Sequence, residues 1–145
     1  MEASKTWKDY FDFSETVNGT PIYYAGIKGP IALCLHGAGD SSMTFACMAK
    51  SLKVYAQVIA FDFKGHGMSE HNEISYHIDK LIEEAENIVA YLYSKQPKTN
   101  IVMVGHSVGG SVATRFVEKM VNHSTEYKYA PNVKRIIMMR VIYDR

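Results

Sequence analysis

One short segment constrains the fold of this chain more than any other feature: Gly105-His106-Ser107-Val108-Gly109. It lies between a continuous apolar run and a stripe of apolar residues at helical spacing, which predict a buried strand and a helix. A strand that turns directly into a helix leaves little room for side chains, and Gly105 and Gly109 avoid a collision with the helix or the strand; for Gly109 we expect the collision to be with the preceding strand. Ser107 is then held in a strained backbone conformation, with its hydroxyl projecting above the sheet. A glycine-flanked helix cap also produces this pattern, but the flanking strand and helix favour the sharp turn, which we call the elbow (residues 105–109).

Apolar runs and helical patterns alternate along the rest of the chain. Apolar runs predict a short strand at residues 22–26, buried strands at 31–35, 57–61 and 101–104, and a last strand at about 135–142. Helical spacing predicts a long helix over 74–92, which Pro97 ends, and a second helix over 108–121. A shorter helix capped by Ser41 or Ser42 follows residues 31–35, and a polar loop spans 122–132. This alternation predicts the α/β class, with a mostly parallel sheet and helices on both faces.

Length and composition exclude several classes of protein. The 145 residues suggest one domain, and a hydrophobic content of 47% excludes intrinsic disorder as the main state. A net charge of +1 provides no broad field for binding nucleic acid or an acidic membrane surface. No apolar run reaches the roughly 18 residues that a bilayer span needs, and no secretory signal is visible. We interpret Cys34 and Cys47, which lie in apolar segments, as reduced core thiols of an intracellular protein.

Glycine-rich loops follow the predicted strands, at the end of the sheet where open α/β proteins bind their ligands. The turn His36-Gly37-Ala38-Gly39 comes directly after the strand at 31–35. Beside a serine elbow, such a turn supplies one backbone amide to an oxyanion, and the residue after the serine supplies the other. Ala38 is the best candidate for the first amide, with Gly39 next, and Val108 is the candidate for the second. Without the elbow, a plain tight turn would explain these glycines equally well.

A second loop carries two residues that invite a catalytic interpretation. Asp62 ends the strand at 57–61, and His66 stands between Gly65 and Gly67. An aspartate at a strand end commonly caps the loop that follows, and a histidine between two glycines commonly fixes the loop's shape. We therefore expect both residues to have structural roles.

Together, these motifs resemble the α/β-hydrolase superfamily. The order along the chain is His36-Gly37, then Asp62 with Gly65-His66-Gly67, then the elbow followed by Gly110. Within the superfamily, the chain is similar to the protein phosphatase methylesterases. The residues that carry this similarity are Trp7, Tyr10, Phe11, the turn at 36–39 with Ser41 after it, and Ile136-Ile137-Met138-Met139.

The resemblance implies a serine carboxylesterase of the α/β-hydrolase fold, with Ser107 as the nucleophile. It also implies a protein substrate and partner, the catalytic subunit of the type-2A serine/threonine phosphatase, whose C-terminal leucine carries the methyl ester. No cofactor or metal is implied, and neither nucleic acid nor a membrane is expected as a partner. We expect the protein in the cytoplasm, the nucleus or both.

The chain departs from the family pattern in the rest of a catalytic triad. Where the family has an aspartate directly after the segment matching residues 136–139, this chain has Arg140, and Asp144 lies roughly 13 Å farther along an extended strand. Only His123 follows Ser107, roughly 24 Å away along a helix, which is too far for a base. His36 could approach the serine from its turn, whereas the His106 side chain should leave the elbow in another direction. A triad acid and histidine are therefore not evident.

The family also continues well beyond this point, so we expect residues 1–145 to form a single, incomplete α/β-hydrolase domain, truncated after the strand that follows the elbow helix. The strand at 135–142 would then be an exposed apolar edge, and the isolated chain would aggregate. Two alternatives to an active methylesterase stay open. One is a truncated, catalytically impaired homologue that acts at most by binding, and the other is a different serine esterase or lipase of the same fold.

Overall fold

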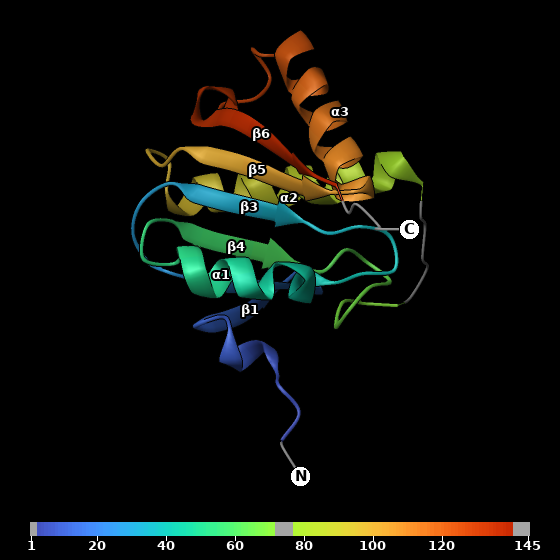
Figure 1. Cartoon of the computed structure of the whole chain (residues 1–145). Helices are drawn as coiled ribbons and strands as arrows, with labels where there is room; N and C mark the ends of the chain where they lie inside the picture. The colour runs from blue at the N-terminus through green and yellow to red at the C-terminus, as the bar shows by residue number, and fades with distance from the viewer. Residues whose placement is uncertain (1–2, 72–76, 141–145) are drawn as a thin grey trace.

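The computed structural model, which describes residues 3–71 and 77–140, is built around a six-stranded sheet (Figure 1). The strands are β1 (Phe13–Val17), β2 (Thr20–Ala25), β3 (Ile31–Leu35), β4 (Gln57–Phe61), β5 (Ile101–His106) and β6 (Val133–Met139). The α-helices are α1 (Ala46–Leu52), α2 (Ile78–Lys95) and α3 (Val108–Asn122). Short 3-10 helices lie at Trp7–Asp9, Ser42–Phe45 and Ala130–Asn132.

The strands follow the order β1-β2-β4-β3-β5-β6 across the sheet. β3 pairs parallel with both β4 and β5, and β5 pairs parallel with β6. β1 and β2 form an antiparallel hairpin, which joins the rest of the sheet through antiparallel pairing of β2 with β4. The expected mostly parallel sheet is confirmed, and parallel pairing brings the carboxyl ends of β3, β4 and β5 to one end of the sheet.

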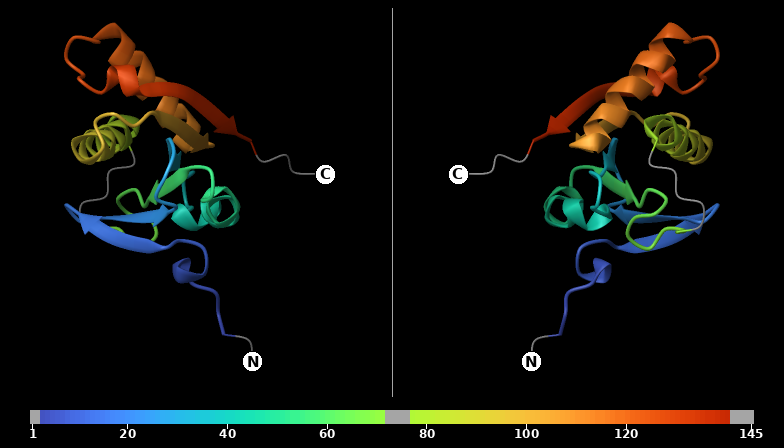
Figure 2. Two further views of the ribbon diagram at one scale, coloured as in Figure 1. Left: turned by 90° about the vertical axis from the view of Figure 1, so that its left-hand side faces the viewer. Right: turned by 90° about the vertical axis from the view of Figure 1, so that its right-hand side faces the viewer.

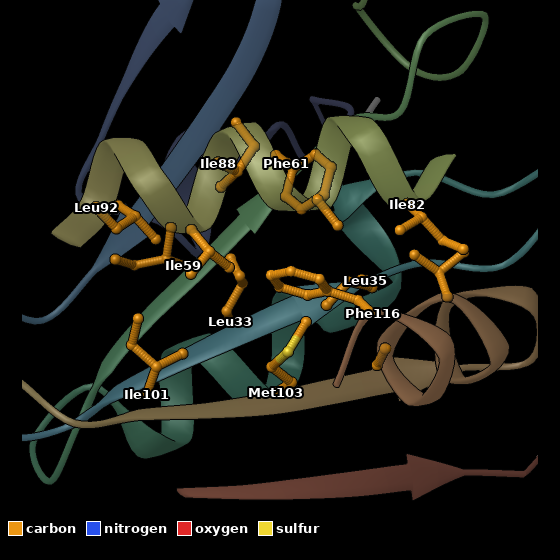
Figure 3. Packing of buried hydrophobic residues seen from close by; sticks show 14 of the residues in the cluster. Leu33, Leu35, Ile59, Phe61, Ile82, Ile88, Leu92, Ile101, Met103 and Phe116 are labelled. Carbon is orange, nitrogen blue, oxygen red and sulfur yellow. The ribbon is translucent and has the colours of Figure 1, made fainter. Parts of the chain in front are cut away.

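Along the interior strands, alternate side chains belong to two hydrophobic clusters that lie on opposite faces of the sheet. Leu33 and Leu35 of β3 lie in the larger cluster, which Figure 3 shows between the sheet and the helices α2 and α3. Cys34, between them in sequence, belongs to the smaller cluster, together with Phe45 and Ala49 beside and within α1. Figure 2 shows α1 on one side of the sheet and α2 and α3 on the other. Helices on both faces are therefore confirmed, and they explain why β3 and β4 read as continuous apolar runs.

The two long helices form where the sequence shows apolar stripes at helical spacing. The buried residues of α2 are Leu81, Ile82, Ala85, Ile88, Val89 and Leu92. α2 ends at Lys95, two residues before Pro97, and its expected start at residue 74 lies outside the described residues. Within 3–71 and 77–140, no helix combines the length and the apolar character that a membrane crossing requires.

The sequence patterns do not predict β1, and they start β2 two residues late. A signal for this hairpin is the pair Asn18-Gly19, whose φ angles of 50° and 79° are the left-handed values that a tight hairpin turn needs. The apolar pattern of β1 is weak because most of the strand is exposed, including Phe13 at its start. Gly26, expected inside β2, lies past its end.

Three other expectations need correction. Cys47 is exposed on α1, so only Cys34 is a core thiol. The supposedly polar loop at 122–132 contributes Tyr127 and Tyr129 to the larger hydrophobic cluster, where both rings pack against Phe116 of α3. β6 begins at Val133 rather than 135 and ends at Met139, while residues 141–142 of the expected strand lie outside the described residues.

Candidate active site

Ser107 occupies the junction between β5 and α3, with the backbone geometry expected of the elbow. Its φ of 53° and ψ of −119° lie in a region that side-chain-bearing residues rarely adopt, and the residue is exposed. The amides of Gly110 and Ser111 donate to Ser107 O at 2.9 and 3.3 Å, which starts the helix directly after the serine. The abrupt change from strand to helix therefore presents Ser107 to solvent at the carboxyl end of β5.

The elbow requires glycine at two positions, each because of a different neighbour. A Cβ on Gly105 would collide with the backbone of Gly110, in the first turn of α3. A Cβ on Gly109 would collide with the carbonyl of Leu35, at the end of β3. We expected a side chain at position 109 to collide with β5, the strand before the elbow. This expectation is wrong, because the start of α3 lies against the end of β3 instead.

The turn from Gly37 to Asp40 packs directly onto the elbow. A Cβ on Gly37 would lie 3.2 Å from Ser107 Cβ and 3.1 Å from both His106 Nδ1 and Asp40 Oδ2. The amide of Asp40 donates to Gly37 O at 3.2 Å and closes the turn, which we call the 37–40 turn. The two glycine-rich segments, found separately in the sequence, thus lie side by side.

Ala38 and Val108 line the same small cavity beside the elbow. The cavity has a volume of about 90 Å³, and its other lining residues are His36, Gly37, Phe63, His66 and Leu81. Within the described part of the chain, no hydrogen bond uses the amide of Ala38 or of Val108. Val108 is also the first residue of α3, where the amide dipoles of the helix favour negative charge. Gly39 lies in the same turn but does not line the cavity.

His36 does not serve as a base for Ser107, because other groups occupy both of its ring nitrogens. Nε2 accepts a hydrogen bond from the amide of Phe63 at 3.1 Å, so the proton is on Nδ1, which donates to Gly37 O at 2.7 Å. The side chain is fully buried, and this burial lowers the pKa of His36 from its ordinary value. A neutral His36 therefore ties β3 to the loop after β4.

Asp62 and His66 have the structural contacts that their positions predict. The buried Asp62 carboxylate accepts from the amides of Ser42 at 2.8 Å and Met68 at 3.0 Å, and from the Tyr23 hydroxyl at 3.3 Å. It thereby joins the segment after the 37–40 turn to the loop after β4. His66 is buried within its own loop, where its Nδ1 lies 3.1 Å from Lys64 O.

The described residues place no acid–histidine pair on the Ser107 hydroxyl. No hydrogen bond joins Ser107 Oγ to a histidine ring within them, and His123 lies at the far end of α3 beside Glu126. Arg140 is exposed and directly follows Met139, whose carbonyl accepts from the Ser107 amide at 3.5 Å, and Asp144 lies outside the described residues. His106 turns its Nδ1 toward Asp40, at 3.5 Å from Oδ2.

Sequence reasoning missed Asp40, whose carboxylate faces His106 beside the elbow. Asp40 directly follows the glycine-rich turn, and that adjacency was the one signal available. Within residues 3–71 and 77–140, no three histidine, cysteine, aspartate or glutamate side chains are grouped so that they could hold a metal ion.

Comparison with known proteins agrees with this geometry. The family model described as serine aminopeptidase, S33, matches residues 28–138. Among solved structures, the chain resembles E-2-(acetamidomethylene)succinate hydrolase with a TM-score of 0.69, at 23% identity, over 86% of this chain and 42% of that chain. A likeness at this level of identity shows the fold, which is that of an α/β-hydrolase.

Curated relatives carry a more specific name. The chain is 27% identical over 147 residues to protein phosphatase methylesterase 1 of Bos taurus, and 31% identical over 135 residues to that of Kluyveromyces lactis. These alignments cover 94% and 84% of this chain, but 36% and 32% of the two relatives. The chain thus spans about a third of the length of the curated relatives that it matches.

Proposed function

We propose a carboxylic-ester hydrolase function from one premise: the chain belongs to the α/β-hydrolase family described as serine aminopeptidase, S33. The observation that carries the proposal is the position of Ser107, which is exposed, held at a φ of 53°, and packed against the 37–40 turn. Nucleophilic catalysis needs a hydroxyl that substrate can reach and donors that meet the charge it creates. The elbow and the turn supply both at one end of the sheet.

In the proposed reaction, Ser107 Oγ attacks the carbonyl carbon of an ester. The amides of Ala38 and Val108 stabilise the negative charge that develops on the carbonyl oxygen. The alkoxide leaves as an alcohol after it takes up a proton, and a water molecule then hydrolyses the acyl-enzyme to a free acid. A fast reaction needs a base that accepts the proton of the Ser107 hydroxyl, and none of the described residues is hydrogen-bonded to that hydroxyl as such a base.

For the substrate, we propose a methyl-esterified protein carboxylate, namely the C-terminal leucine methyl ester of the type-2A phosphatase catalytic subunit. The name shared by the curated relatives supports this choice. The cavity beside Ala38 and Val108 also supports it, because a volume of about 90 Å³ with Phe63 and Leu81 among its lining residues suits a small apolar group.

A second candidate is a homologue that binds the phosphatase without hydrolysing the ester. Two observations favour it: the lack of an imidazole on Ser107 Oγ among the described residues, and Arg140 next to the strand end that adjoins Ser107. A fixed positive charge does not stabilise an imidazolium as a carboxylate does. This candidate predicts recognition of the ester without acyl transfer.

Labelling with a fluorophosphonate probe tests the proposed function. We expect Ser107 to be labelled, and at least about a hundredfold more slowly than in the full-length bovine relative, because general-base assistance is typically worth 10²–10⁴-fold. The Ser107→Ala variant is the control and should take up no label. Labelling as fast as in the relative would contradict the expected lack of a base, and the complete absence of label on Ser107 would favour the binding-only homologue.

A further inference from the structure

His106 carries a buried ring nitrogen that has no hydrogen-bond partner in the described part of the chain. Its Nδ1 is shielded from solvent, and the Asp40 carboxylate faces it with Oδ2 at 3.5 Å. About 13% of the His106 side chain is exposed, compared with 43% of the Asp40 side chain. Buried polar atoms in native proteins are nearly always hydrogen-bonded, so a donor and an acceptor that face each other across this gap need an explanation.

In the described part of the chain, the contacts that anchor the 37–40 turn to the elbow lie at Gly37 and Asp40. Ala38 and Gly39 are exposed, and a Cβ on Gly39 would meet no atom within 4 Å. At one end, Gly37 packs on Ser107, and at the other, Asp40 faces His106. The direction of the Ala38 amide therefore depends on where the side chain of Asp40 is held.

His106 is the fixed member of this pair. It is the last residue of β5, stands opposite Met139 of β6, and directly precedes Ser107. β5 pairs with β3 as far as Gly105 and with β6 as far as His106, and this pairing restrains the end of the strand. A hydrogen bond between the two side chains would consequently move the turn rather than the strand.

We propose that Asp40 and His106 act as a positioning pair for the 37–40 turn. The inference rests on the proposed function, because the turn stabilises an oxyanion only if Ser107 attacks an ester carbonyl. His106 donates its Nδ1–H to Asp40, and the separation shortens to the roughly 2.8 Å of a charge-assisted hydrogen bond. The bond fixes the far end of the turn on the same strand end that carries Ser107. The Ala38 amide is thereby aimed at the oxygen of the carbonyl that Ser107 attacks.

A different role for His106 would be that of base for Ser107. The ring edge with Nδ1 faces Gly37 and Asp40, which agrees with positioning. The two roles also differ in what can replace the histidine. An asparagine amide can donate a hydrogen bond to Asp40, but it cannot take a proton from a hydroxyl.

The test measures the reaction of the full chain with a fluorophosphonate. In this reaction a bond forms between Ser107 Oγ and phosphorus, the P–F bond breaks, fluoride leaves, and the hydroxyl proton passes to solvent. The maximal labelling rate reports on oxyanion stabilisation, and the half-saturating probe concentration reports on binding. We expect His106→Phe and Asp40→Leu to lower the maximal rate by about tenfold and to change the half-saturating concentration by less than about twofold.

The conservative variant His106→Asn should stay within about threefold of the unchanged chain, because it keeps a donor for Asp40. His123→Phe, at the exposed end of α3, is the matched control and should leave both constants unchanged. Should His106→Phe fail to fold, Asp40→Leu at the more exposed partner still decides the matter. Equal losses in His106→Asn and His106→Phe would overturn the proposal, and so would an unchanged rate in Asp40→Leu.

A measurement that does not depend on labelling separates this inference from the proposed function. Nitrogen-15 NMR of the histidine rings should show an Nδ1–H of His106 that is protected from exchange, and Asp40→Leu should abolish this protection. If Ser107 takes no label while the protection is present, the proposed function fails and the pair stands as a structural contact. If no protection is seen, the positioning pair is wrong whatever the labelling rate.

Discussion

Two regions of the sheet differ in how tightly their surroundings constrain the residues: the carboxyl ends of the central strands β3 and β5, and the strand β6 at the end of the strand order. At the carboxyl ends of β3 and β5, backbone meets backbone, and neither Gly105 nor Gly109 has space for a Cβ. On β6, which within the described residues pairs with β5 alone, Ile137 is 50% exposed and Met138 is 63% exposed. A substitution at the elbow therefore has to displace main chain, whereas one on β6 changes mainly what the surface presents to other molecules.

This difference separates two kinds of constraint on the sequence. The proposed nucleophile depends on interior contacts that tolerate no added atom, because packed interiors respond to a single extra methyl group. The β6 edge tolerates substitution within the fold, but among the described residues it presents exposed apolar side chains and backbone groups with no neighbouring strand, and we expect it to be a site for association. Changes to the elbow should act on folding, and changes to β6 should act on solubility.

The largest expected effect is that of Gly109→Val. The added side chain would collide with the Leu35 carbonyl at the end of β3, so α3 could not start in its present position. We expect a loss of at least about 3 kcal/mol in the free energy of unfolding, beyond ordinary overpacking, because the colliding atoms belong to the backbone. Urea denaturation followed by circular dichroism measures this loss.

Gly39→Ala is the matched control for that experiment. Gly39 has a φ of 77°, but a Cβ there would meet open space, so only the backbone conformation opposes the change. We expect a cost of about 1–2 kcal/mol. If the two variants lost the same stability, the contrast between a packed elbow and an open turn would be refuted.

Much of the interior of this fold was predictable from the sequence, and the reason is physical. β3 and β4 match their predicted bounds, because strands covered on both faces show up as unbroken apolar runs. α3 also matches to within a residue, since one face of it packs on the sheet. The elbow was predictable for a similar reason: glycine spacing reports directly on backbone crowding.

The rest of the structure lacked such signals. β1 is mostly exposed and shows no clear alternation, although Asn18-Gly19 marked its turn. Tyr127 looked like part of a polar loop because only tertiary packing brings its ring to the core. Asp40 and His106 face each other although they are far apart in the sequence, and no local pattern encodes such a contact.

A smaller effect concerns His36 and the dependence of stability on pH. Burial lowers the pKa of His36 in the folded chain below its ordinary value of 6.5, so in the window between the two values the unfolded chain binds more protons. The contribution of His36 to stability is therefore complete above about pH 6.5 and is lost as the pH falls toward the folded-state pKa. We expect the urea midpoint to decrease from about pH 7 to about pH 5.

The variant His36→Gln isolates the contribution of His36 to the pH dependence of stability from the contributions of other titrating groups. A glutamine can still accept a hydrogen bond from Phe63 but does not titrate, so the midpoint should fall less over the same range. Glu84 acts in the opposite direction, because burial raises its pKa above the ordinary 4.5 and favours the folded state as the pH falls. A Glu84→Gln variant removes that opposing contribution. An identical slope in His36→Gln and the unchanged chain would show that His36 is not held neutral by its burial.

The smallest effect on stability, and the sharpest test of the β6 edge, is that of Ile137→Lys. Because half of the Ile137 side chain is already exposed, the change should cost less than about 1 kcal/mol. It should nevertheless reduce self-association, because a lysine on an open strand opposes edge-to-edge pairing. Size-exclusion chromatography with light scattering, over a range of protein concentrations, measures the associated fraction.

Val121→Lys on α3 is the matched control, since Val121 is exposed and apolar but lies on a helix. If both lysines reduced association equally, general surface hydrophobicity rather than the open edge of β6 would drive it.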